Sequence, residues 1–183
     1  EVFSPTTGEV LSTVRLSGAD EVEQAVASAR AAFPAWSGTP VKERVQIFYR
    51  YKFLLEKNLD ELAELIVEEN GKTLDEARAE VLKSVEVTEF ACALPQLFPG
   101  EIEEVSKGVE CRAERQPLGV VASITPFNFP NMVPNWTTPN VLACGNTMLL
   151  KPSELVPLSA NRIAELLQQA GLPDGVFNVV HGG

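Results

Sequence analysis

The sequence is short of positive charge, histidine and cysteine, and each shortage excludes a class of function. Lys and Arg total 15 against 25 Asp and Glu, which gives a formal net charge of -10. Because nucleic-acid binding rests on cationic contacts to phosphate, we expect no nucleic-acid partner. The single histidine and three cysteines have no metal-ligand spacing, so we expect no metal site and reduced thiols, as in a cytoplasmic protein.

Long apolar runs and standard phosphate-binding loops are also missing. No segment is long and apolar enough to cross a bilayer, and no charged-then-apolar signal peptide opens the chain, so we expect no membrane partner. Neither a G-x-G-x-x-G after a strand nor a Walker A loop is present. With 183 residues, 45% of them hydrophobic, the chain can still form a sizeable core. An anionic cofactor would need other local donors.

Residues 17–95 have the apolar spacing of a nearly continuous series of helices. The expected helix boundaries are marked by three capping-box pairs, one glycine stop and two prolines: Ser17–Asp20, Asn58–Glu61, Thr73–Glu76, Gly71, Pro34 at a helix end and Pro40 at a helix start. Residues 108–115 instead alternate between polar and apolar. This alternation predicts a half-exposed antiparallel strand that is a candidate for pairing outside its own domain.

From residue 118 the pattern becomes strand–helix–strand–helix–strand. We expect buried strands at 118–124, 147–150 and 176–180, with helices at 132–144 and 157–170. Such alternation predicts an α/β fold with a parallel sheet and right-handed crossovers. Because the alternation stops after the third strand, we expect the chain to be a fragment of a larger protein.

Polar residues follow the first two strands, at the sheet edge where open α/β folds bind ligands. The side-chain amide of Asn128, if held in a dry aromatic pocket, can donate to a developing oxyanion, although an asparagine that satisfies turn backbone is the common alternative. Lys151 and Glu154 can hydrogen-bond ribose hydroxyls, or form only an exposed salt bridge or a cap. Cys144 is interpreted as a buried inert thiol. His181 has no evident partner for triad chemistry and receives no role.

Four stretches carry a resemblance that covers the whole chain. They are residues 125–130 (TPFNFP), 143–147 (ACGNT), 151–154 (KPSE) and 171–180 (GLPDGVFNVV). In order and spacing they resemble the aldehyde dehydrogenase superfamily. Phe127, where many members carry tryptophan, and residues 175–180 are most similar to the methylmalonate-semialdehyde dehydrogenases of that superfamily, which use NAD and coenzyme A to make an acyl-CoA.

The resemblance implies a division of the chain. Residues 1–97 would form the N-terminal helical part of the cofactor-binding domain, and 98–117 would form oligomerisation-arm strands. Residues 118–183 would form the first half of a Rossmann-like NAD-binding sheet of βαβαβ type. The catalytic domain and its nucleophilic cysteine would be absent, so the chain alone would be inactive.

The same resemblance implies residue roles. Asn128 would be the oxyanion donor, and Lys151 and Glu154 would bind the adenosine ribose. Thr125, through its backbone, and Phe127 would line the cofactor cleft. Leu155, where this subfamily often has arginine, would offer only backbone and packing. A substrate carboxylate would be held from the fourth helix, where the candidates are Arg78 and Lys83.

The function implied is the NAD-dependent oxidation of a semialdehyde, such as methylmalonate or malonate semialdehyde, to an acyl-CoA by a homo-oligomer. Two alternatives stay open. One is an aldehyde dehydrogenase that acts on another small aldehyde and releases the acid by hydrolysis. The other is a non-catalytic fragment that binds a nucleotide or pairs with a partner. NAD is expected over NADP, because the charge of Glu154 disfavours a 2′-phosphate.

Overall fold

The computed structural model describes residues 1–182 and is built around a parallel sheet of three strands, β5 (Val120–Ile124), β6 (Thr147–Lys151) and β7 (Phe177–Val179). The strand order is β5-β6-β7, with Val120 opposite Thr147 and Met148 opposite Phe177. The predicted parallel βαβαβ unit is therefore confirmed. The last residue of the predicted half-sheet, Gly183, lies outside the described residues.

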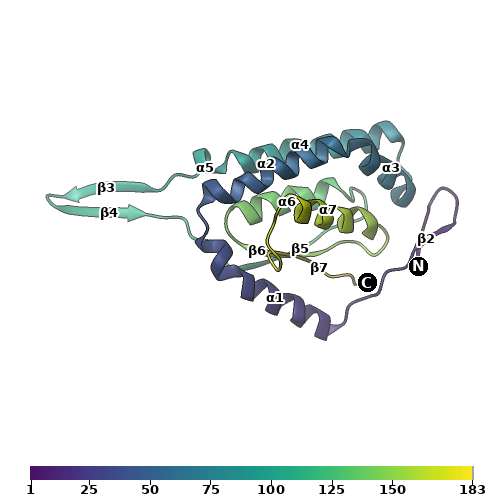
Figure 1. Cartoon of the computed structure of the whole chain (residues 1–183), viewed down its shortest axis with the longest axis horizontal. Coiled ribbons are helices and arrows are strands. Elements are labelled where there is room, and N and C mark those ends of the chain that lie inside the picture. The colour runs from purple at the N-terminus through teal and green to yellow at the C-terminus, as the bar shows by residue number, and fades with distance from the viewer. Residues whose placement is uncertain (183) are drawn as a thin grey trace.

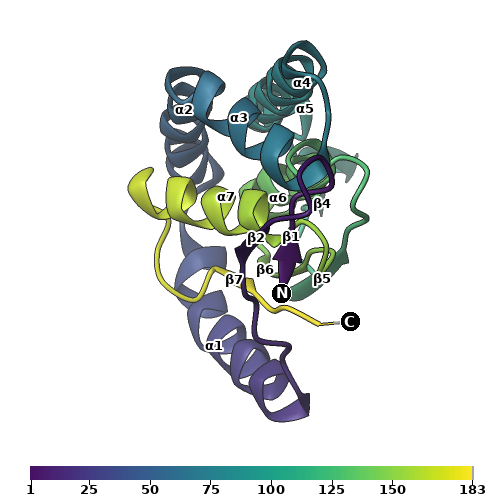
Figure 2. The same ribbon diagram turned by 90° about the vertical axis from the view of Figure 1, so that its right-hand side faces the viewer.

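Helices cover both faces of the sheet (Figures 1 and 2). Helix α1 (Ala19–Gly38) lies on one face, while α6 (Met132–Ala143) and α7 (Pro157–Gln169) lie on the other. An outer layer of α2 (Val41–Lys57), α3 (Leu59–Asn70) and α4 (Leu74–Cys92) packs on α6 and α7, and the short α5 (Leu94–Leu97) follows. The main core lies between these layers and includes fully buried side chains such as Phe48, Tyr51, Ile66, Leu142 and Ile163.

Four of the six expected helix boundaries are confirmed: Pro40 and Asn58 directly precede α2 and α3, Thr73 precedes α4, and Gly71 follows α3, whereas Ser17 and Pro34 are not boundaries. Thr73 and Glu76 form the capping box of α4, and Gly71 ends α3 in the left-handed region at φ 79°. The boundaries at Thr73 and Gly71 thus come from local hydrogen bonding and from the freedom of glycine at positive φ.

Asn58 is the N-cap residue of α3, but its side chain donates back to the Leu54 carbonyl (2.7 Å), so the expected capping box with Glu61 does not form. The two wrong boundaries have local and tertiary causes. At the start of α1, Glu21 accepts from the Gly18 amide (2.8 Å), so the predicted Ser17–Asp20 pair is one residue out. Helix α1 also continues through Pro34, because Trp36 in its last turn is buried and donates its indole N–H to the Leu142 carbonyl (3.0 Å). Tertiary packing there outweighs the cost of an interior proline, about 3 kcal/mol.

The first strand of the sheet is less buried than its apolar sequence predicts. Strand β6 is central, and Met148 and Leu150 have no exposed surface. Strand β5 is an edge of the sheet within residues 1–182, and the flanking Leu118 and the terminal Ile124 are 93% and 79% exposed. An apolar run cannot say which strand is central, because that depends on what packs beside it.

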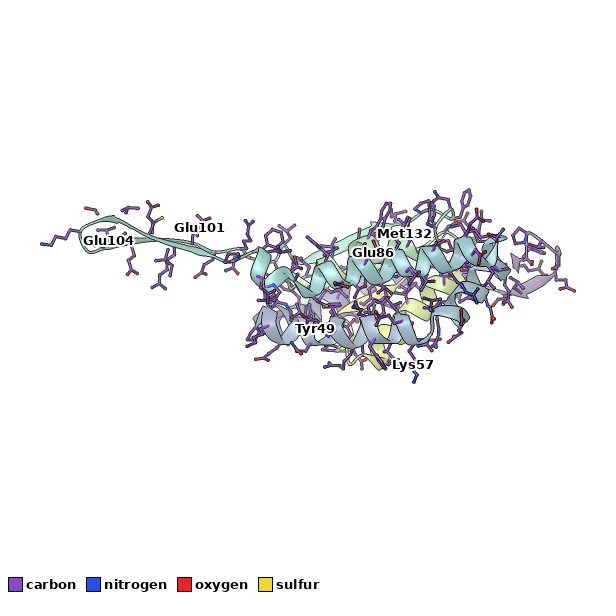
Figure 3. All side chains as sticks on the ribbon, turned by 90° about the horizontal axis from the view of Figure 1, so that it is seen from above. Tyr49, Lys57, Glu86, Glu101, Glu104 and Met132 are labelled. Atoms are coloured by element: carbon purple, nitrogen blue, oxygen red, sulfur yellow. The ribbon has the colours of Figure 1, made fainter. Side chains whose placement is uncertain are left out.

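Strands β3 (Glu101–Ser106) and β4 (Val109–Ala113) form an antiparallel hairpin that projects away from the rest of the molecule (Figure 1). All residues of both strands are exposed, so the predicted half-burial is wrong for residues 1–182. The labelled Glu101 and Glu104 lie far from the helices in Figure 3. A second small ribbon, β1 (Val2–Phe3) with β2 (Val10–Ser12), lies at the other end of the molecule. No helix in residues 1–182 has the length and apolar composition needed to span a membrane.

Candidate functional site

The carboxyl ends of the three strands meet at one edge, which Figure 2 faces. The Thr125 amide donates to the Lys151 carbonyl (3.0 Å), and the Val180 amide donates to the Leu150 carbonyl (2.9 Å), so the ladder continues past the ends of β5 and β7. The segments after all three strands therefore emerge side by side. As the sequence predicts, residues 125–131 and 151–155 lie at the same edge.

Four backbone groups of the 125–132 loop are held by side chains of α3, of α4 and of the turn between them. The Asn70 side chain donates to the Phe127 carbonyl (2.8 Å), and the Lys72 ammonium donates to the Asn128 carbonyl (2.7 Å). One oxygen of Glu80 accepts from the amides of Asn131 (2.8 Å) and Met132 (3.1 Å). Met132 is labelled beside α4 in Figure 3. The loop that carries Asn128 is thus fixed from residues far away in the sequence.

The Asn128 side chain is exposed, beside an exposed Phe127 and a half-buried Phe129. The dry aromatic pocket expected around it is therefore not formed within residues 1–182. Within residues 1–182 the side-chain amide of Asn128 makes no hydrogen bond to the turn. Lys72 and Glu80 bond the loop backbone instead. A donor that the turn does not use is available to a ligand at this edge.

Beside Asn128 lies a groove of about 540 Å³. Its walls are the loops after β5 and β6, the end of α3 and the N-terminal segment, and they include Phe127, Asn128, Leu155, Glu69 and Asn70. Three of the predicted site residues thus line one depression. Leu155 is exposed, so its side chain can pack against a ligand.

Lys151 and Glu154 form an ion pair with 3.4 Å between Nζ and Oε2. Their side chains are 28% and 43% exposed, so both stay accessible from solvent. The pKa of Glu154 is lowered, first by a hydrogen bond from its own backbone amide and then by Lys151. At neutral pH the edge therefore presents a cation and a carboxylate side by side, a pair able to bracket adjacent hydroxyl groups.

The N-termini of α6 and α7 are both occupied by buried carboxylates. Glu80 from α4 caps α6, and Glu69 from α3 accepts from the amides of Leu158 (2.8 Å) and Ser159 (2.9 Å) at the start of α7. Burial raises the pKa of Glu69. Helix N-termini are common phosphate sites, but these two already hold an anion. Neither cap could be predicted from local sequence, because each carboxylate lies 51 to 90 residues from the amides that donate to it.

Arg78 and Lys83, the candidates for a substrate carboxylate, do not approach the loop of Asn128. Arg78 pairs with Asp60 (2.9 Å), and Lys83 pairs with Glu86 one turn along α4. All four side chains are largely exposed. Neither cation makes a hydrogen bond to residues 125–131, so the geometry of residues 1–182 selects neither.

Cys144 is exposed, so its predicted burial is wrong. Helix α6 ends at Ala143, and Cys144 lies in the turn before Gly145, on a depression of about 850 Å³ that also includes Arg44 and Arg115. Partial desolvation still raises the pKa of its thiol. Because this turn precedes β6, Cys144 lies at the amino end of the sheet, away from Asn128.

His181 follows β7 and lies at the carboxyl edge of the sheet, which its sequence context did not predict. Its Nε2 lies 3.0 Å from the Asn161 Oδ1. Burial, and then the charge of Lys151, lower its pKa, which favours the neutral imidazole at pH 7. The histidine is thus a neutral neighbour of the Lys151–Glu154 pair.

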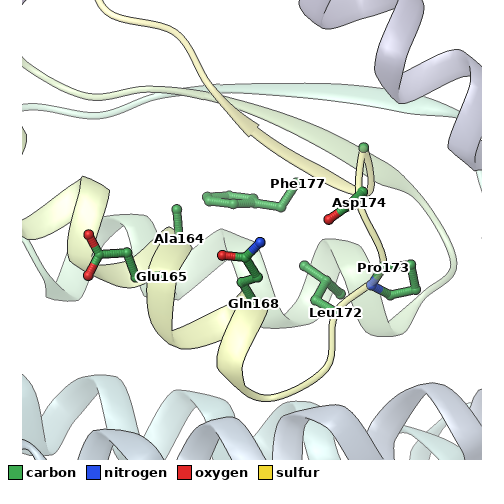
Figure 4. A pocket seen from close by; sticks show the side chains of 8 residues that line it. Ala164, Glu165, Gln168, Leu172, Pro173, Asp174 and Phe177 are labelled. Carbon is green, nitrogen blue, oxygen red and sulfur yellow. The ribbon is translucent and has the colours of Figure 1, made fainter.

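A further depression of about 230 Å³ lies between α7 and the turn before β7 (Figure 4). The labelled Gln168, Leu172, Asp174 and Phe177 surround it. It is near the amino end of β7, and no predicted site residue lines it. The carboxyl edge remains the candidate site.

The chain is similar to known proteins over its whole length. The aldehyde dehydrogenase family model matches residues 1–183. A malonate-semialdehyde dehydrogenase of Pseudomonas aeruginosa is 50% identical over 183 residues, which are 100% of this chain and 37% of that protein. The chain therefore spans a little over a third of this curated relative.

Solved structures extend the comparison to the fold. A methylmalonate-semialdehyde dehydrogenase from Oceanimonas doudoroffii is 49% identical with a TM-score of 0.96, over 99% of this chain and 37% of that one. A Sinorhizobium meliloti protein, described as a candidate methylmalonate-semialdehyde dehydrogenase and solved with NAD, is 44% identical with a TM-score of 0.96, over 100% and 37%. An NADP-dependent enzyme of E. coli is 37% identical with a TM-score of 0.95, over 100% and 38%.

Proposed function

This chain belongs to the aldehyde dehydrogenase family, and from that premise we propose that it is the cofactor-binding portion of an NAD-dependent semialdehyde dehydrogenase. The observation that carries the proposal is the shared edge at which Asn128, Lys151 and Glu154 emerge from neighbouring parallel strands. The relative solved with NAD supports the choice of cofactor.

The side chains at the carboxyl edge of the sheet are chemically suited to bind a dinucleotide. Lys151 and Glu154 would hold the adenosine ribose, and Thr125, Phe127 and Leu155 would line the cleft. NAD, when bound, supplies the hydride acceptor. With the N-termini of α6 and α7 already capped by Glu80 and Glu69, the pyrophosphate would lie elsewhere.

Asn128 would stabilise the oxyanion that forms when a nucleophile adds to the aldehyde carbon. An oxyanion donor must be oriented before the reaction, because reorganisation during the step would cost free energy. The loop that carries Asn128 is fixed at four backbone groups, which favours such an orientation by setting the direction in which the side chain leaves the backbone. Enclosure of the site would come from a bound cofactor and further protein.

The nucleophile in this family is a cysteine thiolate, and we propose that it is not one of the three cysteines of this chain. Cys92 is buried in the helical layer with its pKa raised to about 11, Cys111 lies on the projecting hairpin, and Cys144 lies at the amino end of the sheet. None is beside Asn128. The chain alone is therefore expected to bind the cofactor without turning over.

The substrate proposal is malonate or methylmalonate semialdehyde, with coenzyme A as the acyl acceptor. It is supported by the 50% identity to malonate-semialdehyde dehydrogenases. The test is NADH formation by the full-length protein with each semialdehyde, with and without coenzyme A, and with product identification by mass spectrometry. An acid product at the same rate without coenzyme A would favour the hydrolytic alternative, and absence of NADH with every aldehyde would favour the non-catalytic one.

We also propose that the β3–β4 hairpin pairs with another copy of the protein. Its strands expose apolar side chains and unpaired edges, a combination that invites pairing; these side chains include Ile102, Val105 and Val109. Deleting residues 101–113 from the full-length protein should lower the number of copies per particle, as measured by light scattering, and an unchanged number would refute the role.

Free thiols at all three cysteines also support a cytoplasmic location.

A further inference from the structure

Lys72 reaches from the turn between α3 and α4 into the loop that carries Asn128. Its ammonium donates to the Asn128 carbonyl (2.7 Å) and to Glu80 Oε2 (2.5 Å), and it lies 3.8 Å from the centroid of the Phe129 ring. Only 17% of the side chain is exposed. One cation therefore contacts the backbone of Asn128, the ring that follows it and a buried carboxylate.

Glu80 extends this contact to the far end of the same loop. Its second oxygen accepts from the amides of Asn131 and Met132, where α6 begins. Lys72 and Glu80 together connect the carbonyl of residue 128 with the amides three and four residues later. The peptide between Asn128 and Phe129 is thus fixed on both sides, and so is the direction in which the Asn128 side chain leaves the backbone.

We propose that Lys72 is a positioning residue for Asn128, acting through the carbonyl of Asn128 and with Glu80 as its anchor. This rests on the proposed role of Asn128 as the oxyanion donor. Without the ammonium, the 128–129 peptide is free to rotate, and the exposed amide loses its fixed direction. A misplacement of about 1 Å is enough to cost on the order of a hundredfold in rate.

The kinetic test uses the full-length protein with Lys72→Met, Lys72→Arg and Asn128→Ala. Methionine keeps an apolar stem near Phe129 but removes the donors, while arginine keeps the charge and the donors. We expect Lys72→Met to lower kcat about tenfold or more with a KM for NAD within about threefold, and Lys72→Arg to recover most of the loss. Lys52→Met is the matched control, because Lys52 pairs with Glu56 and Glu89 and, within residues 1–182, makes no hydrogen bond to the loop.

The double variant separates positioning from general stabilisation. If Lys72 acts only through Asn128, Lys72→Met combined with Asn128→Ala is no slower than Asn128→Ala alone. If the two losses multiply, Lys72 acts on the rate by another route and the proposal is overturned. Equal losses in Lys72→Met and the Lys52→Met control would also overturn it.

Hydrogen exchange on the 183-residue chain tests the same contact without catalysis. We expect the amides of Asn131 and Met132, which donate to Glu80, to exchange at least tenfold faster in Lys72→Met, with the exchange of α2 unchanged. Unchanged exchange in the loop would refute the positioning role. A full-length protein that oxidises no aldehyde would refute the proposed function, and the exchange result would still decide whether Lys72 fixes the loop.

Discussion

Glu80 and Glu69 are buried carboxylates that cap neighbouring helices and differ in one contact, so they form a matched pair for a stability experiment. They are 3% and 2% exposed, and each accepts from two backbone amides at the start of a helix. Only Glu80 also pairs with a lysine, Lys72. Truncating each to alanine leaves a similar cavity, so the difference in cost reports on the lysine.

Glu69→Ala removes a helix cap, and we expect it to lower the free energy of unfolding by about 1–2 kcal/mol. Glu80→Ala removes a cap and also leaves the Lys72 ammonium, which is mostly buried, without its carboxylate. Breaking a buried pair from one side costs about 3–5 kcal/mol. The excess for Glu80→Ala should therefore be about 2 kcal/mol.

Urea unfolding of the 183-residue chain at pH 7, followed by circular dichroism, measures both variants. Adding Lys72→Met to Glu80→Ala should recover part of the excess, because the orphaned charge is then gone. If Glu69→Ala costs as much as Glu80→Ala, or if the double variant recovers nothing, the Lys72–Glu80 pair does not stabilise the fold as argued.

Three further predictions concern charge and thiol chemistry. Burial raises the pKa of Glu69 above its ordinary value of 4.5, so the stability that this group contributes is full below pH 4.5 and declines as the pH rises. The difference in free energy of unfolding between wild type and Glu69→Ala should therefore be larger at pH 4 than at pH 7, and a difference that grows with pH would contradict this. Calorimetric titration of the full-length protein should show tighter binding of NAD than NADP, with the preference reduced in Glu154→Gln; tighter NADP binding would refute the role of Glu154. Iodoacetamide at pH 8 should label the exposed Cys111 first and Cys92 last, since a pKa of about 11 leaves roughly one thiolate in a thousand; equal labelling by mass spectrometry would count against the burial of Cys92.

The sheet was predictable from the sequence because its signals are local. Apolar runs closed by polar turns marked β5, β6 and β7, and helix-length spacing between them indicated parallel pairing. The relative burial of β5 and β6 was not predictable. Both runs are mostly apolar, and the neighbours of a strand, rather than its own residues, decide how much of it is covered.

The placement of the candidate site residues was predictable in part for the same reason. Asn128, Lys151 and Glu154 follow strands, and parallel strands bring their carboxyl ends together. Lys72 and Glu80 gave no such signal, because their contacts with the loop span 51 to 56 residues and depend on how α4 packs against α6. The burial of Cys144 was predicted wrongly because α6 ends at the buried Ala143. Cys144, one residue later, points toward solvent.

The most direct test of the account is the kcat of Asn128→Ala in the full-length protein with a semialdehyde substrate. Loss of one oxyanion donor should lower kcat on the order of a hundredfold and leave the KM for NAD nearly unchanged. Asn58→Ala, which removes an amide that within residues 1–182 is bonded only to the Leu54 carbonyl, is the control and should keep the wild-type kcat. A wild-type kcat in Asn128→Ala would remove Asn128 from the chemistry and contradict the proposed use of this edge.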